Sequence, residues 1–340
     1  VLTMVSLKEL TRPDVLSFIR AHEGEDPTAV ALRSDVPSEF PLKEAATQIG
    51  LREKARRKLP FLCGRDALFE RTALEQCSGE AAARYRASFP AGARGIDLTG
   101  GLGVDTLFLC TRFEEFHYCE RNEQLHALFE YNRSLFPEKK VHTHRADGIS
   151  FLESCADGCF DWIYLDPSRR GGGRRSVDIR YCTPDITKVL ALLLQKGRNV
   201  CVKLAPAFEA TEMFRLTARC HRAIYVSVAG ECKELLCFFG RGTCSDPRRE
   251  AHVVNETGES VYSAAAPAVS GRESLVPCAE PGGWLCEPDP AIIRAGLSHV
   301  CAGSFGLHCI NPRIDYLSGA HDPGPGFPGR RRREPVRVNR

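Results

Sequence analysis

A glycine-rich stretch at residues 95–106, Gly-Ile-Asp-Leu-Thr-Gly-Gly-Leu-Gly-Val-Asp-Thr, carries residue types that could hold a small ligand. Glycines at 101 and 103 would let the backbone approach a ligand closely because they have no Cβ. Asp97, where an apolar run ends, could accept a hydrogen bond from an ammonium group, directly or through water. The stretch predicts a ligand-binding turn, with candidate residues Asp97, Thr99, Gly101, Gly103 and Asp105.

Two more acids end the next two apolar runs. Glu120 follows Asp97 at roughly the 20-residue separation at which adenosine-binding sheets place a ribose-binding acid. Asp147 ends the third run and could accept the amino group of an adenine. Either acid alone could simply cap a helix. Acids at the ends of three consecutive strands, on one sheet edge, favour an adenosine-binding site.

Residues with a possible role in a reaction follow the fourth and fifth apolar runs. The fourth run leads into Asp166-Pro167-Ser168-Arg169-Arg170, in which Asp166 could accept a hydrogen bond from an amine. Arg169 and Arg170 could bind phosphate or carboxylate, or could be solvated loop charges. Lys203 ends the fifth run and could contact substrate or pair structurally with Asp166. The catalytic candidates are Asp166, Pro167 and Lys203.

The elements that would position these residues are short apolar runs alternating with helical segments, which predicts an α/β fold with a parallel sheet. We expect strands at 94–99, 114–120, 141–147, 160–166, 198–205, 222–229 and 233–239, and helices near 103–111, 121–135, 148–155, 183–196 and 208–218. A helix follows each of the first five strands. Only Gly230 and its neighbours separate the last two, which predicts a terminal antiparallel hairpin.

The sequence around this domain changes character. Residues 1–91 show helical spacing of apolar side chains, and residues 92–240 carry the predicted sheet. Residues 241–320, rich in Pro, Gly and Ser, would form a small C-terminal domain in which Asp289-Pro290 begins a short helix. Residues 321–340, dominated by Pro, Gly and Arg, predict a disordered basic tail.

Composition narrows the class of protein. Of 340 residues, 43% are hydrophobic and 26% charged, and no apolar run is long enough for a membrane span. The 16 scattered cysteines favour free thiols in a cytoplasmic protein, and the absence of a C-x-x-C pair argues against a metal site. A net charge of +3 does not by itself predict a nucleic-acid partner. Basic runs at 52–58, 169–175 and 330–333 could bind phosphates or be solvated.

The glycine-rich stretch discriminates between two adenosine cofactors. A dinucleotide fingerprint would need glycine at position 106, where this chain has Thr106. It would also place a pyrophosphate at the helix start, where Asp105 would repel it. S-adenosylmethionine has no phosphate, so its binding loop tolerates that acid.

Together these motifs resemble the ordered motifs of class I S-adenosylmethionine-dependent methyltransferases, over about 150 residues. More narrowly, Glu-Gln-Cys-Ser-Gly-Glu at 75–80, Asp-Pro-Ser-Arg-Arg at 166–170 and Glu-Cys-Lys-Glu at 231–234 are similar to bacterial methyltransferases with a C-terminal THUMP-like domain. THUMP domains bind RNA, so the resemblance implies a tRNA or rRNA substrate, with an exocyclic amine as the candidate methyl acceptor. Ser168 and Arg169 replace the second proline and the aromatic residue of the usual amine-methylating motif, so the motif supplies no stacking ring.

Two rival functions stay open from the sequence alone. The chain could be an RNA-binding protein that keeps a methyltransferase fold without turnover. It could instead be an NAD-dependent oxidoreductase on a similar fold, although Asp105, Thr106 and the terminal hairpin argue against that.

Overall fold

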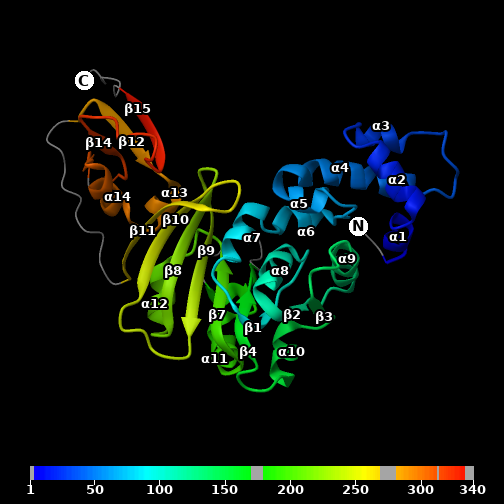
Figure 1. Ribbon diagram of the computed structural model, residues 1–340, viewed down its shortest axis with the longest axis horizontal. Helices are drawn as coiled ribbons and strands as arrows, with labels where there is room; N and C mark the ends of the chain where they lie inside the picture. Colours follow the sequence, from blue (N-terminus) through cyan, green and yellow to red (C-terminus); the bar gives the residue numbers. More distant parts are fainter. Residues whose placement is uncertain (1–3, 170–178, 269–280, 312–313, 334–340) are drawn as a thin grey trace. The chain divides into compact units, whose positions relative to one another are not determined.

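The computed structural model of the chain describes residues 4–169, 179–268, 281–311 and 314–333. The chain divides into two compact units, residues 1–155 and 156–340. Figure 1 labels their helices and strands. None of the described helices is long and apolar enough to cross a membrane.

The first unit begins with the predicted helical region. Apolar side chains such as Leu10, Val15 and Ile19 recur at helical spacing and are buried, so they form the core of this region. Its helices are α1 (Met4–Leu10), α2 (Pro13–Ala21), α3 (Pro27–Ala31), α4 (Leu42–Lys58), α5 (Pro60–Cys63), α6 (Arg71–Gln76) and α7 (Glu80–Arg86).

Three parallel strands and their helices complete the first unit. In chain order the elements are β1 (Gly92–Asp97), α8 (Val104–Leu109), the 3₁₀ turn η1 (Cys110–Arg112), β2 (Phe113–Cys119), α9 (Glu123–Ser134), β3 (Val141–His144) and α10 (Gly148–Ser154). Asp97 pairs in register with Tyr118, and Cys119 with His144. The carboxyl ends of the three strands therefore line up at one edge.

The second unit continues the pattern of parallel strands and ends it with a hairpin. Parallel strands β4 (Phe160–Leu165) and β7 (Gly197–Leu204) are connected through α11 (Ile186–Lys196). After α12 (Ala210–Leu216), β8 (Cys220–Val228) and β9 (Glu231–Gly240) pair antiparallel. Their turn is Ala229-Gly230, with φ of 52° and 75°, the left-handed geometry of a tight hairpin. The predicted α/β class with a terminal antiparallel hairpin is confirmed.

The strand array of the second unit extends past the predicted domain boundary at residue 240. Strand β10 (Arg248–Val254) pairs parallel with β8, and β11 (Ser260–Pro267) pairs antiparallel with β10. We expected residues 241–320 to form a separate domain, so residues 248–267 correct that boundary. Local patterns did not predict this, because no helix lies between β9 and β10 and the partner of β10, β8, is remote in the chain.

A separate four-stranded sheet lies near the C-terminus. Its strands are β12 (Trp284–Pro288), β13 (His308–Cys309), β14 (Leu317–Gly319) and β15 (Gly329–Arg333), in the order β13-β14-β12-β15. Helices α13 (Pro290–Arg294) and α14 (Ser298–Phe305) accompany it, and Asp289 caps α13 as expected, by accepting from the Ala291 N–H at 2.8 Å.

The prediction of a disordered tail was wrong for residues 329–333, since β15 pairs antiparallel with β12 along its length. Arginine-rich composition indicated disorder, but pairing with a buried neighbour decides whether such a segment folds. Residues 334–340 lie outside the described residues.

Candidate cofactor-binding site

Asp97 is the centre of the glycine-rich turn. Its side chain is buried, and the Thr106 hydroxyl donates to Oδ2 at 2.7 Å while the Thr99 N–H donates to Oδ1 at 3.0 Å. The carboxylate thus joins the end of β1 to the first turn of α8. Sequence reasoning used Thr106 only to argue against a dinucleotide and missed that its hydroxyl holds Asp97. A hydroxyl residue on the first turn of the following helix was the available signal.

Glycine occupies positions 101 and 103 of the turn for different physical reasons. Gly103 has φ of +79°, and a Cβ there would lie 2.0 Å from the Phe129 ring, so packing forbids a side chain. Gly101 has φ of +54°, yet the nearest heavy atom to its Cβ position is 3.9 Å away. Gly101 is therefore the position of this turn where the backbone is open to a ligand.

A stacked pair of aromatic rings packs against the glycine-rich turn. Tyr118 of β2 stacks on Phe129 of α9 with ring centroids 3.9 Å apart, and its hydroxyl donates to the Gly101 carbonyl at 2.7 Å. A Cβ on Gly100 would meet the Tyr118 ring at 1.9 Å. Burial raises the pKa of Tyr118, which keeps the phenol as a neutral donor. Neither Gly100 nor Tyr118 was among the sequence candidates.

Glu120 joins the end of β2 to this turn. One carboxylate oxygen accepts from the Gly101 N–H at 2.9 Å, and the other accepts from the Asn122 N–H at 2.7 Å. The structure therefore brings Glu120 and Gly101 together, as the sequence predicted for adjacent strand ends. A carboxylate has about four lone-pair positions, so Glu120 retains acceptor capacity for two ribose hydroxyls.

Asp147 begins α10 as its N-cap. Its Oδ1 accepts from the Ile149 and Ser150 N–H groups, each at 3.1 Å. The next residue, Gly148, approaches the loop after β1 so closely that a Cβ would lie 2.2 Å from the Leu98 carbonyl oxygen. Asp147 thus acts as a helix cap and also lies beside the glycine-rich turn, with a second oxygen that could accept an amino group.

Asp105 has a different environment from the one expected for a cofactor residue. Its Oδ1 pairs with the guanidinium of Arg86, whose Nε donates at 3.0 Å, and its Oδ2 accepts from the Ser78 hydroxyl at 2.9 Å. All three side chains are buried. The carboxylate therefore connects α8 to the segment around α7 within the first unit.

The Glu-Gln-Cys-Ser-Gly-Glu motif at 75–80 gains a physical role from these contacts. Ser78 reaches Asp105, and Glu80 accepts from the Phe61 N–H at 2.7 Å while pairing with Arg84. The motif holds the N-terminal helices to one another and to α8, immediately after the glycine-rich turn. Sequence reasoning noticed the motif only as a mark of family resemblance.

In the second unit, the structure brings two catalytic candidates together. The Lys203 ammonium lies 2.5 Å from an Asp166 carboxylate oxygen, since Leu165 of β4 and Val202 of β7 pair in register just before them. The Lys203 side chain is 12% exposed and that of Asp166 is 35% exposed. Pro167 is buried. The side chain of Arg169 and all of Arg170 lie outside the described residues.

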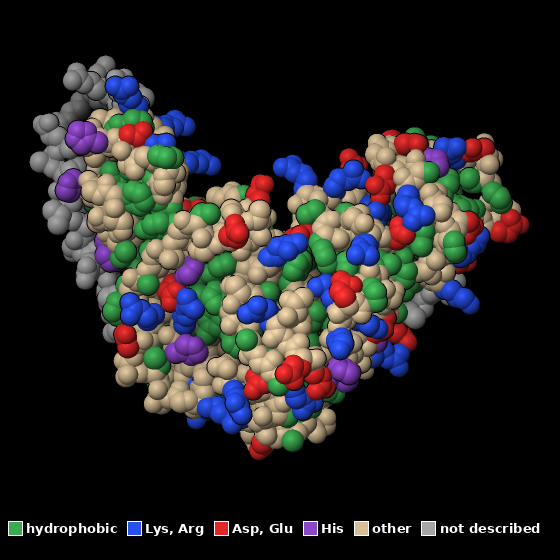
Figure 2. Space-filling view, in the orientation of Figure 1, with side chains coloured by type: hydrophobic (Ala, Val, Ile, Leu, Met, Phe, Trp, Pro, Cys, Tyr) green, Lys and Arg blue, Asp and Glu red, His purple; other side chains and the backbone are tan. Residues whose placement is uncertain are grey.

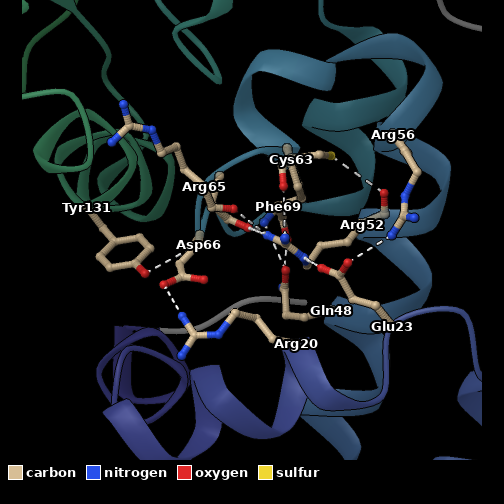
Figure 3. Close-up of polar contacts among 11 residues, drawn as sticks. Arg20, Glu23, Gln48, Arg52, Arg56, Cys63, Arg65, Asp66, Phe69 and Tyr131 are labelled. Atoms are coloured by element: carbon tan, nitrogen blue, oxygen red, sulfur yellow. Dashed lines mark hydrogen bonds and ion pairs between the residues drawn. The ribbon is translucent and has the colours of Figure 1, made fainter.

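Two arginines of the basic run at 52–58, Arg52 and Arg56, make polar contacts drawn in Figure 3. The buried Arg52 donates to Glu23 at 2.6 Å and to the carbonyls of Cys63, Arg65 and Ala67. Arg56 pairs with the same Glu23 at 2.9 Å. The Lys58 ammonium donates to the Leu74 and Glu75 carbonyls, so Arg52 and Lys58 are engaged in internal contacts, whereas Lys54, Arg56 and Arg57 are exposed.

Comparisons with known proteins agree with this geometry. No protein-family model matches the chain. The chain is 28% identical over 281 residues to an uncharacterized S-adenosylmethionine-dependent methyltransferase of Mycobacterium tuberculosis. This relative is found in strains CDC 1551 / Oshkosh and ATCC 25618 / H37Rv. The matched residues cover 80% of this chain and 73% of the relative.

A solved structure of a protein assigned to the same class is also similar to this chain. The crystal structure of a protein from Porphyromonas gingivalis W83 that is assigned as a methyltransferase superposes with a TM-score of 0.79 and 26% identity. The superposition covers 96% of this chain and 81% of that one.

Proposed function

We propose that this chain, an S-adenosylmethionine-dependent methyltransferase, transfers its methyl group to RNA. The observation that best supports cofactor binding at the glycine-rich turn is the bond from the Gly101 N–H to Glu120, 2.9 Å long. It sets a ribose-type acceptor beside the open backbone position of the turn. The residues fit the cofactor because this edge offers carboxylates and a Cβ-free backbone but no phosphate-binding group.

The chemical roles divide among the strand ends. The cofactor, when bound, supplies a methyl group already activated on a sulfonium. Glu120 would hold its ribose, Asp147 its adenine amino group, and Asp97 with Thr99 would keep the turn in shape for its amino-acid end. Asp105, held by Arg86, would fix the first turn of α8. Proximity and alignment are the main contributions that the protein makes to such a displacement.

Asp166 is the proposed acceptor-binding residue. It would accept a hydrogen bond from an amine of the acceptor and orient the nitrogen lone pair, with the carbonyl of the Asp166-Pro167 segment as a second acceptor. The Lys203 ammonium, 2.5 Å from the carboxylate, would fix its orientation. Arg169 and Arg170 would bind acceptor phosphates. The proton released from the methylated amine would pass to Asp166 or to water.

The case for RNA as acceptor rests on sequence resemblance and on charge. The motifs at 75–80, 166–170 and 231–234 resemble those of methyltransferases with a THUMP-like domain, and a consecutive run of arginines forms β15. We propose that the C-terminal part serves as an RNA-binding accessory domain of a cytoplasmic enzyme. The acceptor could be tRNA or rRNA.

Two substitutions separate cofactor binding from transfer. Glu120→Ala should weaken S-adenosylhomocysteine by about 1–3 kcal/mol in calorimetry, the cost of lost charged hydrogen bonds. Glu123→Ala is the matched control, because that carboxylate is 60% exposed and pairs with Arg145 on the surface. Equal affinities for the two variants would remove Glu120 from the cofactor site.

Asp166→Asn should leave cofactor affinity within a few-fold while lowering the single-turnover rate by about 10²-fold, the scale of losing a positioned acid–base group. Asp157→Asn, at a carboxylate that is 61% exposed, is the control. The acceptor itself is identified by mass spectrometry of modified nucleosides in RNA from a deletion strain. A full set of RNA modifications in that strain would refute the proposal of an RNA acceptor.

A further inference from the structure

The second unit contains a cavity far along the chain from Asp166. It has a volume of about 490 Å³, which lies in the range of small-molecule sites. Its walls come from the β8–β9 turn, β10, β11, the end of β12, the start of α13 and the segment that leads into β15. Nothing in the proposed transfer reaction uses this cavity.

Much of the cavity lining is apolar. Val261 and Tyr262 of β11 line it together with Phe327 and the prolines 288, 290, 325 and 328. Val261 is 62% exposed, so its side chain is accessible. Phe305 lies 6.0 Å from Tyr262 and 5.4 Å from Phe327, measured between ring centroids, so the aromatic rings are packed in fixed positions.

Three charged residues also line the cavity, namely Glu287, Asp289 and Arg330. Glu287 of β12 and Arg330 of β15 are partners across the two strands, and both line the cavity. Asp289 also lines it, but it is only 3% exposed and its carboxylate accepts from the Ala291 N–H and the Ser227 hydroxyl. The half-buried Glu287 is therefore the more accessible carboxylate for a ligand, and Arg330 is the cation of the lining.

A row of positive charge leads away from this cavity. Strand β15 is at the edge of its sheet, and Arg330, Arg332 and Arg333 are exposed. Arg330 and Arg332 point to the same face, about 6.6 Å apart along the strand. Arg331 points to the opposite face, where it pairs with Asp322 and lies 6.0 Å from the Trp284 ring centroid. Figure 2 shows blue side chains along the margin where Figure 1 draws β15.

We infer that this cavity binds one base of a single-stranded nucleic acid, with neighbouring phosphates along Arg330 and Arg332. The inference rests on RNA as the acceptor and assigns a second contact for it. A positive row beside an aromatic surface is the combination by which proteins hold single strands. In this assignment the base lies against Tyr262, Glu287 accepts from its amino group and Arg330 binds the adjoining phosphate.

The charges favour this occupant over two others. A purely apolar metabolite would gain nothing from the exposed arginine row. An acidic peptide would be attracted to the arginines, but Glu287 would repel its carboxylates within the cavity. A nucleotide presents an amino or imino donor toward Glu287 and an anion toward Arg330.

The test measures binding of a fluorescein-labelled ten-nucleotide single-stranded RNA to the full chain by anisotropy, across a series of salt concentrations. Arg330→Gln combined with Arg332→Gln should weaken binding by at least about 10-fold and reduce the slope of log affinity against log salt by roughly 1.4, which is about 0.7 per phosphate contact. Tyr262→Ala should weaken binding by about 10-fold with the salt slope unchanged, since stacking carries no counterion release.

Controls separate this effect from general charge and from misfolding. Arg215→Gln combined with Arg219→Gln removes the same charge from exposed positions at and after α12 and should leave affinity within two-fold. Tyr262→Phe keeps the ring and should bind as the unmodified chain does. All variants must keep the same melting temperature and the same affinity for S-adenosylhomocysteine.

Specific outcomes would overturn the inference. Unchanged affinity of Tyr262→Ala, equal binding of a blunt RNA duplex, or displacement of the single strand by polyglutamate at equal charge would each do so. A DNA strand of the same sequence should bind within a few-fold, because no residue of the cavity is assigned to the 2′-hydroxyl. If the single strand binds at the cavity but no RNA is methylated, the proposed function fails and this inference stands.

Discussion

Two basic segments look alike in the sequence and differ in the folded chain. In α4, two basic residues of the run at 52–58 lie against other helices of the first unit, where Arg52 donates to internal carbonyls and Glu23 and Lys58 donates to internal carbonyls, while Lys54, Arg56 and Arg57 are exposed. In β15, the run at 330–333 lies on a sheet edge, where most of its side chains are exposed.

The difference shows that a charge count is no measure of the charge available to a partner. A guanidinium has five N–H donors in a fixed plane, so several carbonyls and one carboxylate can satisfy it completely when it is buried. On an edge strand no such acceptors surround alternate side chains, and the donors stay available.

The largest effect should come from Arg52→Ala. Removing a buried guanidinium leaves three carbonyls and part of Glu23 without their donor, and breaking such a pair costs about 3–5 kcal/mol of unfolding free energy. Urea denaturation measures it. The control Arg56→Ala removes a guanidinium that is 58% exposed and should cost less than about 1 kcal/mol. A similar loss in both variants would mean that burial does not distinguish these two arginines.

An intermediate effect is expected from Lys58→Met, which keeps the aliphatic stem and removes the ammonium. The Leu74 and Glu75 carbonyls then lose donors at 2.7 and 3.0 Å, and the unfolding free energy should fall by about 1–3 kcal/mol. Thermal unfolding provides the measurement, with Lys54→Met, at an exposed position of the same helix, as control. No shift in Tm relative to that control would show that Lys58 is as free as its sequence suggested.

The smallest effect on stability belongs to Arg332→Gln. Its side chain is exposed on β15, so the unfolding free energy should change by no more than about 0.5 kcal/mol. Denaturation under the same conditions as for Arg52→Ala allows direct comparison. A loss above about 1 kcal/mol would mean that Arg332 of β15 is packed like Arg52 of α4, and the contrast between these two arginines would disappear.

The strand ends were the part of the site that sequence patterns predicted well. Apolar runs followed by acids placed Asp97, Glu120 and Asp147 at the carboxyl ends of β1, β2 and β3, as the structure has them. The carboxyl ends of β1 and β2 are buried and so end recognisably at a polar residue, whereas β3 is polar and only half-buried. Whether these acids bind the cofactor stays a prediction.

The roles of buried polar residues could not be predicted in the same way. Asp105 has the spacing of a cofactor residue, yet its partners are Arg86 and Ser78, which precede the glycine-rich turn in the sequence. Residue types and spacing do not say which distant donors a carboxylate will meet. That depends on how α7 packs against α8.

The sequence by itself determined the alternation of strands and helices, the hairpin after β8 and the glycine-rich turn, because periodicity and local turn chemistry act over a few residues. Only the tertiary structure decided that β10 and β11 continue the strand array, that the tail contributes β15, and which arginines remain exposed. Strand pairing and burial join residues that are remote in the chain. No local pattern encodes their partners.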